Sequence, residues 1–196
     1  MARDVHPLFA TRGPPGTHDL ALLERKISAL SVAGPQDKTP LPVFNKLTDG
    51  RLPEIDWPRF RGRPRAILID GWCLGALPEA PDALTHPLNR LETERDPDGV
   101  WRKAVNAFTG GDYLALAEQL DARLFLRAPD FDAVLDWRCE QEEGLRGHDL
   151  TAKERHAIAD FIQYFERLTR RMIDGGVRMD VVVQLDRNRL PVSITS

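Results

Sequence analysis

The chain has 196 residues, 42% of them hydrophobic and 29% charged, and 27 basic against 30 acidic residues give a formal net charge of −3. This composition suits one globular domain with a real core and excludes wholesale disorder. A weakly acidic chain has no overall positive charge with which to attract nucleic acid or an anionic membrane, so we expect it to bind neither. The sequence also has no apolar run long enough to span a membrane and no signal-type N-terminus, and we therefore expect a cytoplasmic protein.

The first 17 residues predict an irregular segment followed by a helix. Pro and Gly residues break any period there, and Thr17 is a good helix N-cap. Apolar residues then recur on one helical face, at Leu20, Leu23, Ile27 and Leu30. We therefore predict a helix that begins just after Thr17.

Residues 31–64 predict a long loop. Six prolines and three glycines fall in this span. Structureless connections of this length are unusual inside a compact domain and are commonly functional. We expect the loop to lie against a site.

The rest of the chain alternates short apolar runs with helical patterns. The runs at 66–69, 124–126 and 181–183 have the composition of buried parallel strands. Helical patterns cover residues 98–119, 130–146 and 151–174, the last starting with a capping box of Thr151 and Glu154. This order predicts an α/β fold, a parallel sheet with helices on both faces.

The two cysteines, Cys73 and Cys139, lie far apart and have no metal-ligand spacing. We therefore expect neither a disulfide framework nor structural zinc, and we expect both cysteines to be buried small hydrophobic residues.

Asp70 is the first candidate functional residue. It follows the apolar run 66–69 and precedes Gly71, and acids at the carboxyl ends of parallel strands lie where open α/β sheets bind ligands. Its carboxylate could orient Mg²⁺ with its waters, or a reacting hydroxyl, in phosphoryl transfer. An equally good interpretation is an Asp that caps a turn.

A second candidate site combines Arg12, His18 and Asp19 in a Gly- and Pro-rich segment before a helix start, where an anion is favoured. His18 could act as an acid, a base or a hydrogen-bond donor. A plain N-cap at Thr17, with Asp19 as a first-turn acid, explains most of the same pattern.

Other cations have similar dual interpretations. Lys46 and Arg51 on a polar loop could hold a carboxylate or phosphate, or could simply be solvated. Arg167 lies in the last turns of the final helix, where the dipole alone favours positive charge. Trp137 and Arg138 with Glu140 to Glu142 could form a lid over a nucleotide or the exposed face of a helix.

Together these segments resemble the P-loop kinases of the D-glycerate 3-kinase type, relatives of uridine kinase and pantothenate kinase. The similarity runs nearly end to end. The blocks that carry it are His6-Pro7-Leu8, Thr11-Arg12-Gly13, Gly16-Thr17-His18-Asp19, Pro42 to Arg51, Asp70-Gly71-Trp72-Cys73-Leu74-Gly75, Asn89-x-Leu91-Glu92, Trp101-Arg102, Ala128-Pro129, Trp137-Arg138 with Gln141-Glu142, and Leu185-Asp186-x-Asn188-Arg189.

The resemblance implies ATP-dependent transfer of a phosphoryl group to a small hydroxy acid such as D-glycerate. Asp70 matches the Walker B acid that orients Mg²⁺ through water. Arg12, His18, Asp19, Lys46 and Arg51 match the substrate side, on loops 1–17 and 31–64. Arg138, Gln141, Arg167 and Asn188 match the residues on the nucleotide side. Residues 130–175 match the lid and the last helix.

Two departures qualify this expectation. Val43 and Asn45 replace an Arg and an Asp of the family block around Lys46, which affects substrate identity. The family's Walker A loop, Gly-x-x-x-x-Gly-Lys-[Ser/Thr], is not in the sequence, and neither is the Asp-Asp-Phe-Tyr block that precedes His6 in relatives.

The chain therefore corresponds to the C-terminal two-thirds of one kinase domain. We expect it to lack the first strand-helix units, to be inactive alone, and to self-associate through an exposed sheet edge. The alternatives are a non-catalytic remnant that binds a partner, or one half of a split kinase.

Overall fold

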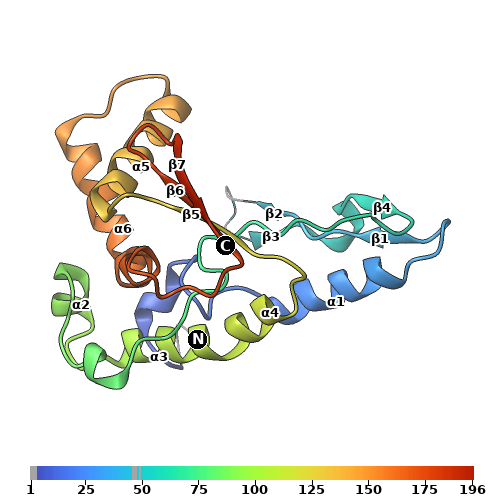
Figure 1. Cartoon of the computed structure of the whole chain (residues 1–196), viewed down its shortest axis with the longest axis horizontal. Helices are drawn as coiled ribbons and strands as arrows, with labels where there is room; N and C mark the ends of the chain where they lie inside the picture. The colour runs from blue at the N-terminus through green and yellow to red at the C-terminus, as the bar shows by residue number, and fades with distance from the viewer. Residues whose placement is uncertain (1–3, 46–47, 49) are drawn as a thin grey trace. The chain divides into compact units, whose positions relative to one another are not determined.

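The computed structural model describes residues 4–45, 48 and 50–196, and these form two compact units (Figure 1). The larger unit joins the chain up to His18 with Trp72–Ser196, and the smaller unit is Asp19–Gly71. The division falls beside both candidate motifs, since His18 and Asp19 lie on opposite sides of one boundary and Asp70 lies next to the other.

The smaller unit consists of a helix followed by short antiparallel strand pairs. Its elements are α1 (Leu20–Val32), β1 (Lys38–Pro40), β2 (Phe44–Asn45), β3 (Gly50–Arg51), a 3₁₀ turn (Glu54–Asp56) and β4 (Arg59–Arg61). β1 pairs with β4 and β2 pairs with β3. The predicted loop at 31–64 is thus divided by short strands, and its first two residues belong to α1.

α1 is capped by Asp19, and the predicted cap at Thr17 is wrong. The Leu22 amide donates a hydrogen bond to Asp19 Oδ1 at 3.0 Å. Asp and Thr are both good N-caps, but Asp19 directly precedes the first helical residue. Thr17 instead closes a turn within the preceding loop.

Residues 66–69 are not a strand, so the predicted buried strand there is wrong. Ile67 and Leu68 are 39% and 97% exposed, and in the described part of the chain no strand pairs with this segment. A strand is stable only when a neighbour satisfies its backbone hydrogen bonds. An apolar run without such a neighbour extends without joining a sheet.

The larger unit contains a mixed sheet. β5 (Leu124–Arg127) pairs parallel with β6 (Val181–Leu185), which pairs antiparallel with β7 (Pro191–Thr195). The predicted strands at 124–126 and 181–183 and their parallel pairing are confirmed. β7 is an exposed edge strand that the sequence analysis did not find.

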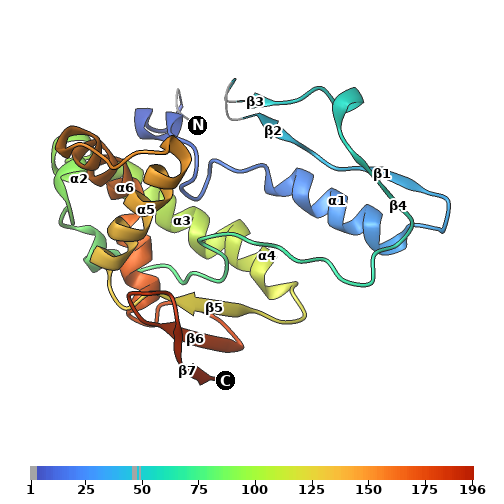
Figure 2. The ribbon, with the colours of Figure 1, turned by 90° about the horizontal axis from the view of Figure 1, so that it is seen from above.

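Helices supply most of the larger unit. They are α2 (Arg90–Arg95), α3 (Val100–Phe108), α4 (Leu114–Glu118), α5 (Phe131–Arg146) and α6 (Ala152–Ile173), with 3₁₀ turns at Pro7–Ala10 and Pro81–Leu84. The turn Thr109–Tyr113, with a kink at Gly111 (φ −97°, ψ −111°), joins α3 to α4, and Figure 2 shows the two helices following one another in nearly one direction. The three predicted helical regions and the capping box of Thr151 and Glu154 are confirmed.

Two apolar clusters hold these helices together. Leu8, Phe9, Leu91 and Trp101 form one cluster, which joins the N-terminal 3₁₀ turn to α2 and α3. Phe131, Cys139, Ile158 and Ile162 form the other, between α5 and α6. α6 contributes to the surroundings of both, because Tyr164 packs against the first cluster.

Both cysteines are buried, as expected, and both are free thiols. None of the helices in the described part of the chain combines the length and apolar character that crossing a membrane requires.

Candidate functional site

The Gly- and Pro-rich loop 11–18 is fixed onto the helices of the larger unit. Gly13 and Gly16 have φ values of +122° and +94°, in the region that favours glycine. A Cβ at Gly13 would lie 2.7 Å from the Phe165 ring on α6, and one at Gly16 would lie 2.5 Å from the Phe108 ring on α3. The two glycines therefore allow the backbone to lie directly on two aromatic rings.

Side-chain hydrogen bonds give the loop a defined shape. Thr17 Oγ1 accepts from the Gly13 amide at 2.9 Å and donates to the Pro14 carbonyl at 2.7 Å. Trp72 Nε1 donates to the Gly13 carbonyl at 3.0 Å, while its indole packs edge-on against Phe165. Thr17 thus organises the loop, and Trp72 connects it to the segment that follows Asp70 and Gly71.

His18 ends this loop against a buried tyrosine. His18 Nδ1 lies 2.6 Å from the phenol oxygen of Tyr113, which also accepts a hydrogen bond from the Gly16 amide at 3.2 Å. Tyr113 is 4% exposed and lies just after the kink at Gly111. The structure therefore attaches the candidate histidine to helix α3–α4 through one phenol.

The surroundings of His18 and Tyr113 shift the pKa of each group so that its uncharged form is favoured. Burial, together with the positive charge of Arg12, lowers the pKa of His18. Burial raises the pKa of Tyr113 to about 12, although the hydrogen bond from Gly16 opposes that rise. At neutral pH the imidazole and the phenol are accordingly both uncharged, with the Arg12 guanidinium as the nearby cation.

In the smaller unit, Asp19 and Arg51 neutralise one another. Arg51 Nη1 donates to Asp19 Oδ2 at 2.7 Å, and both side chains are close to half exposed. The hydrogen bond from the Leu22 amide, followed by that from Arg51, lowers the pKa of Asp19. Asp19 at the N-cap of α1 and Arg51 on β3, two of the predicted substrate residues, therefore lie together. Lys46, predicted beside Arg51, lies outside the described residues.

Asp70 lies at the exposed end of the irregular segment 66–71. Its carboxylate makes no hydrogen bond or ion pair with the described residues, so no turn-capping bond is seen there. Nor do the described ranges contain a cluster of three His, Cys, Asp or Glu side chains suited to a metal ion. The described residues around Asp70 therefore do not by themselves supply a set of ligands for Mg²⁺. The role of Asp70 stays a prediction.

The predicted nucleotide-side residues fall into two places. Arg138 on α5 donates to Gln141 and Glu142 of the same helix. Asn188 lies in the turn between β6 and β7, where its backbone N–H donates to Asp186 Oδ1 at 2.8 Å.

Trp137 links α5 to this same turn. Its Nε1 donates to the Arg187 carbonyl at 2.8 Å, and the Arg189 guanidinium stacks 5.2 Å from the indole. A cavity of about 290 Å³ lies here, lined by Ala133, Asp136, Trp137, Glu140, Arg155 and Arg187. The structure therefore brings the predicted lid to the C-terminal turn, although Arg138, Gln141 and Asn188 do not line the cavity.

Arg167 is saturated by protein partners. Its five N–H groups donate to both carboxylate oxygens of Glu92, to Glu79 Oε2, and to the carbonyls of Ala83 and His86. These bonds attach α6 to α2 and to the segment before it. They favour a structural role for Arg167 over the predicted contact with nucleotide.

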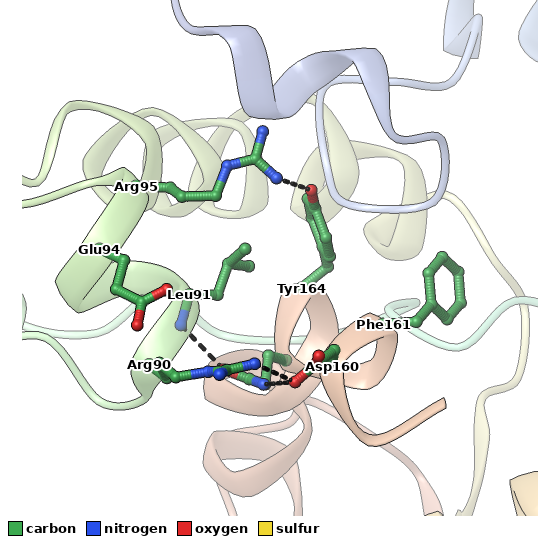
Figure 3. A pocket seen from close by; sticks show the side chains of 8 residues that line it. Arg90, Leu91, Glu94, Arg95, Asp160, Phe161 and Tyr164 are labelled. Atoms are coloured by element: carbon green, nitrogen blue, oxygen red, sulfur yellow. Dashed lines mark hydrogen bonds and ion pairs between the residues drawn. The ribbon is translucent and has the colours of Figure 1, made fainter. Parts of the chain in front are cut away.

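A second cavity, of about 230 Å³, lies between α2 and α6 (Figure 3). Its charged and polar walls are paired with one another: Arg90 with Asp160, Arg95 with the Tyr164 hydroxyl, and the Leu91 amide with Gln163. None of the predicted site residues lines it.

Comparison with known proteins identifies the fold. No protein-family model matches the chain. Its sequence is 23% identical over 202 residues to the uncharacterized kinase mug58 of Schizosaccharomyces pombe, covering 95% of this chain and 70% of that protein. Its structure is similar to the D-glycerate 3-kinase from Cryptococcus neoformans, with a TM-score of 0.72, 21% identity and coverage of 99% and 72%. The chain has the fold of the D-glycerate 3-kinase type.

The chain is also similar to the structure of YGR205w protein, with a TM-score of 0.63 and 22% sequence identity. That match covers 94% of this chain and 66% of the other, so the chain spans about two thirds of the proteins it matches. At the level of the fold, the resemblance inferred from the sequence is confirmed.

Tyr113 is the site residue that sequence reasoning missed. It is one of only two tyrosines in the chain and follows Gly110-Gly111-Asp112 inside a helical pattern. Two consecutive glycines within a helix signal an irregular turn, and this signal could have singled out Tyr113.

Proposed function

We propose that this chain forms part of an ATP-dependent kinase that phosphorylates a small hydroxy acid, with D-glycerate as the first candidate. The observation that carries the proposal is the loop 11–18, which holds His18 against Tyr113 with the Arg12 guanidinium nearby. A cation beside a neutral imidazole suits a small carboxylate. The glycerate-kinase-type fold supports the same substrate class.

Phosphoryl transfer needs groups that this sequence does not contain. A backbone cradle and a lysine normally hold the β- and γ-phosphates, and no Gly-x-x-x-x-Gly-Lys-[Ser/Thr] motif occurs here. We therefore propose that catalysis requires a further polypeptide segment, in the same chain or in another. ATP and Mg²⁺ belong to that completed kinase, to which this chain contributes Asp70 and the loop 11–18.

A second candidate, one half of a split kinase or a non-catalytic binding module, is favoured by the exposed segment 66–71. Ile67 and Leu68 present apolar surface beside Asp70, as expected of a segment that pairs with another polypeptide. Self-association through exposed strand edges belongs to the same set of proposals, and the cytoplasmic location stays a prediction from the sequence.

Complementation tests these proposals. The 196-residue chain would be assayed for ADP release with ATP, Mg²⁺ and D-glycerate, alone and mixed with or fused to the part of the Cryptococcus enzyme that this chain does not match. We expect turnover only after complementation. A folded, complemented protein that phosphorylates no hydroxy acid would contradict the kinase proposal. Stable binding of the added segment without turnover would support the binding module.

A further inference from the structure

The donors and acceptors around the Tyr113 hydroxyl determine whether it donates a hydrogen bond to His18 or accepts one from it. A phenol has one proton to donate. Its oxygen already accepts from the Gly16 amide, and His18 Nδ1 lies 2.6 Å away on a ring that meets the phenol edge-on. The backbone amide of His18 also acts on the phenol oxygen as a donor. Among the described residues, the phenol proton therefore has no acceptor besides His18 Nδ1.

Two arrangements fit this geometry, and they differ in cost. If the phenol donates to Nδ1, all three groups are satisfied. If Nδ1–H donates instead, the phenol proton has no acceptor although Tyr113 is 4% exposed, and an unsatisfied buried donor is destabilising. The first arrangement places the imidazole proton on Nε2, because the hydrogen bond at one ring nitrogen determines the state of the other.

We propose that Tyr113 fixes His18 as the neutral Nε2–H tautomer, so that the ring donates a hydrogen bond to an anionic ligand oxygen and does not act as a base. The raised pKa of Tyr113 and the lowered pKa of His18 agree with this arrangement. Among the described residues, Nε2 has no partner of its own and the ring is only half-buried. Tyr113 is thus a positioning residue for His18.

The ligand atom is a carboxylate or phosphate oxygen. Arg12 supplies positive charge close enough to lower the pKa of His18. A neutral N–H donor beside a guanidinium complements an oxyanion. This part of the inference rests on the proposed kinase function, while the tautomer does not.

Nuclear magnetic resonance tests the tautomer directly. Long-range ¹H–¹⁵N spectra of the full chain would be recorded above the titration range of histidine, with the His18 signals assigned by their loss in His18→Gln. We expect a pyridine-type shift at Nδ1 and a pyrrole-type shift at Nε2. The reverse pattern, or the averaged shifts of a tautomer mixture, would overturn the proposal.

Matched tyrosine variants test the cause. Tyr113→Phe removes only the hydroxyl, and we expect the His18 shifts to move toward those of a mixture. Tyr164→Phe makes the same change at the other tyrosine, whose hydroxyl accepts from Arg95, and should leave His18 unaltered. Unchanged His18 shifts in folded Tyr113→Phe would show that the phenol does not select the tautomer. If that variant does not fold, the wild-type spectrum still decides.

Variants of His18 in the complemented kinase test the role. A glutamine amide can donate from nearly the position of Nε2 but cannot act as a base. We expect His18→Ala to raise KM by roughly 10- to 100-fold, and His18→Gln to recover most of that loss with kcat near wild type.

The substrate whose KM rises identifies the ligand oxygen. A rise in KM for the hydroxy acid assigns the carboxylate as the partner of His18, and a rise in KM for ATP assigns the phosphate. Equal loss of kcat in both variants would indicate a base and overturn the donor role. An inactive wild-type complement would contradict the proposed function and leave the tautomer result standing.

Discussion

Arg167 on α6 and Glu92 on α2 form a two-point ion pair, with Nε 2.8 Å from one carboxylate oxygen and Nη2 2.6 Å from the other. Glu92 is fully buried, and the Leu88 amide donates to the same carboxylate. The pair therefore fixes the position of α2 on α6 inside the larger unit.

Removing one partner of this pair should strongly destabilise the protein. We expect Arg167→Ala to lower the free energy of unfolding by about 3–5 kcal/mol, because Glu92 is left as an uncompensated buried charge. Chemical denaturation measures the change. Arg155→Ala is the control, since the Arg155 side chain on α6 is about half exposed and pairs with the equally exposed Asp136, and it should cost less than about 1 kcal/mol. Equal stability of the two variants would contradict the structural role of Arg167.

Replacing glycine by alanine should have opposite effects on the free energy of unfolding at two positions, Gly16 and Gly144. Gly16→Ala should destabilise the protein by at least about 1–2 kcal/mol, since the residue has a positive φ and its Cβ would collide with Phe108. Gly144→Ala is the matched change in the interior of α5, where nothing lies within 4 Å of the new Cβ. It should stabilise the helix by about 0.5–1 kcal/mol. A Gly16→Ala protein as stable as the wild type would contradict the described packing of the loop.

Asp70→Asn should separate a catalytic carboxylate from a structural one. Because Asp70 is exposed and unpaired among the described residues, we expect the free energy of unfolding of the chain to change by less than about 0.5 kcal/mol. In the complemented kinase, kcat should fall on the order of 10²-fold with little change in KM for the hydroxy acid. Loss of stability with normal turnover would instead assign Asp70 to the structure.

Stability should depend on pH through His18. Its pKa in the folded protein is lowered from 6.5, so below pH 6.5 the unfolded chain binds a proton that the folded chain resists. The free energy of unfolding should therefore fall as the pH decreases from 6.5 through the folded-state pKa. His18→Gln should lose less stability than the wild type over this window, as measured by denaturation at several pH values. Parallel curves for the two proteins would contradict burial of a neutral His18.

Exposed strand edges should drive self-association. Leu124 and Leu126 on edge strand β5 are each 58% exposed. Leu126→Lys should increase the monomer fraction in analytical ultracentrifugation, because edge lysines oppose strand pairing between molecules. Val32→Lys is the control, since Val32 is 82% exposed but ends α1. If both variants behave like the wild type, the edge does not mediate association.

Elements with local determinants could be predicted from the sequence. The capping box of Thr151 and Glu154 defines the start of α6 through bonds between residues three apart, and the predicted helix 151–174 agrees with Ala152–Ile173. Apolar runs likewise located β5 and β6. Features that depend on distant partners could not be predicted in this way.

The errors have physical causes. Residues 66–69 have the composition of a buried strand, but composition cannot supply the neighbour that a strand needs. β7 alternates Val192 and Ile194 with polar residues, so it lacks the continuous apolar run by which β5 and β6 were found. It also follows a turn in which Arg189 has a φ of +64°. His18 and Tyr113 are 95 residues apart in the sequence, and only the tertiary structure brings them together.

The kink at Gly111 makes the spacing between α3 and α4 a constraint on the loop 11–18. Gly111 has φ −97° and ψ −111°, which are not helical values, so α3 and α4 meet at a break in the helix. Each residue of an α-helix turns the chain by about 100°, and deleting one residue between Thr109 and Tyr113 would therefore change the direction of the Tyr113 side chain relative to α3. Tyr113 would then turn away from His18 and Gly16, even though every side chain of the loop was unchanged. Variation in length is consequently least tolerated in a helix that contributes only one hydroxyl group to the site.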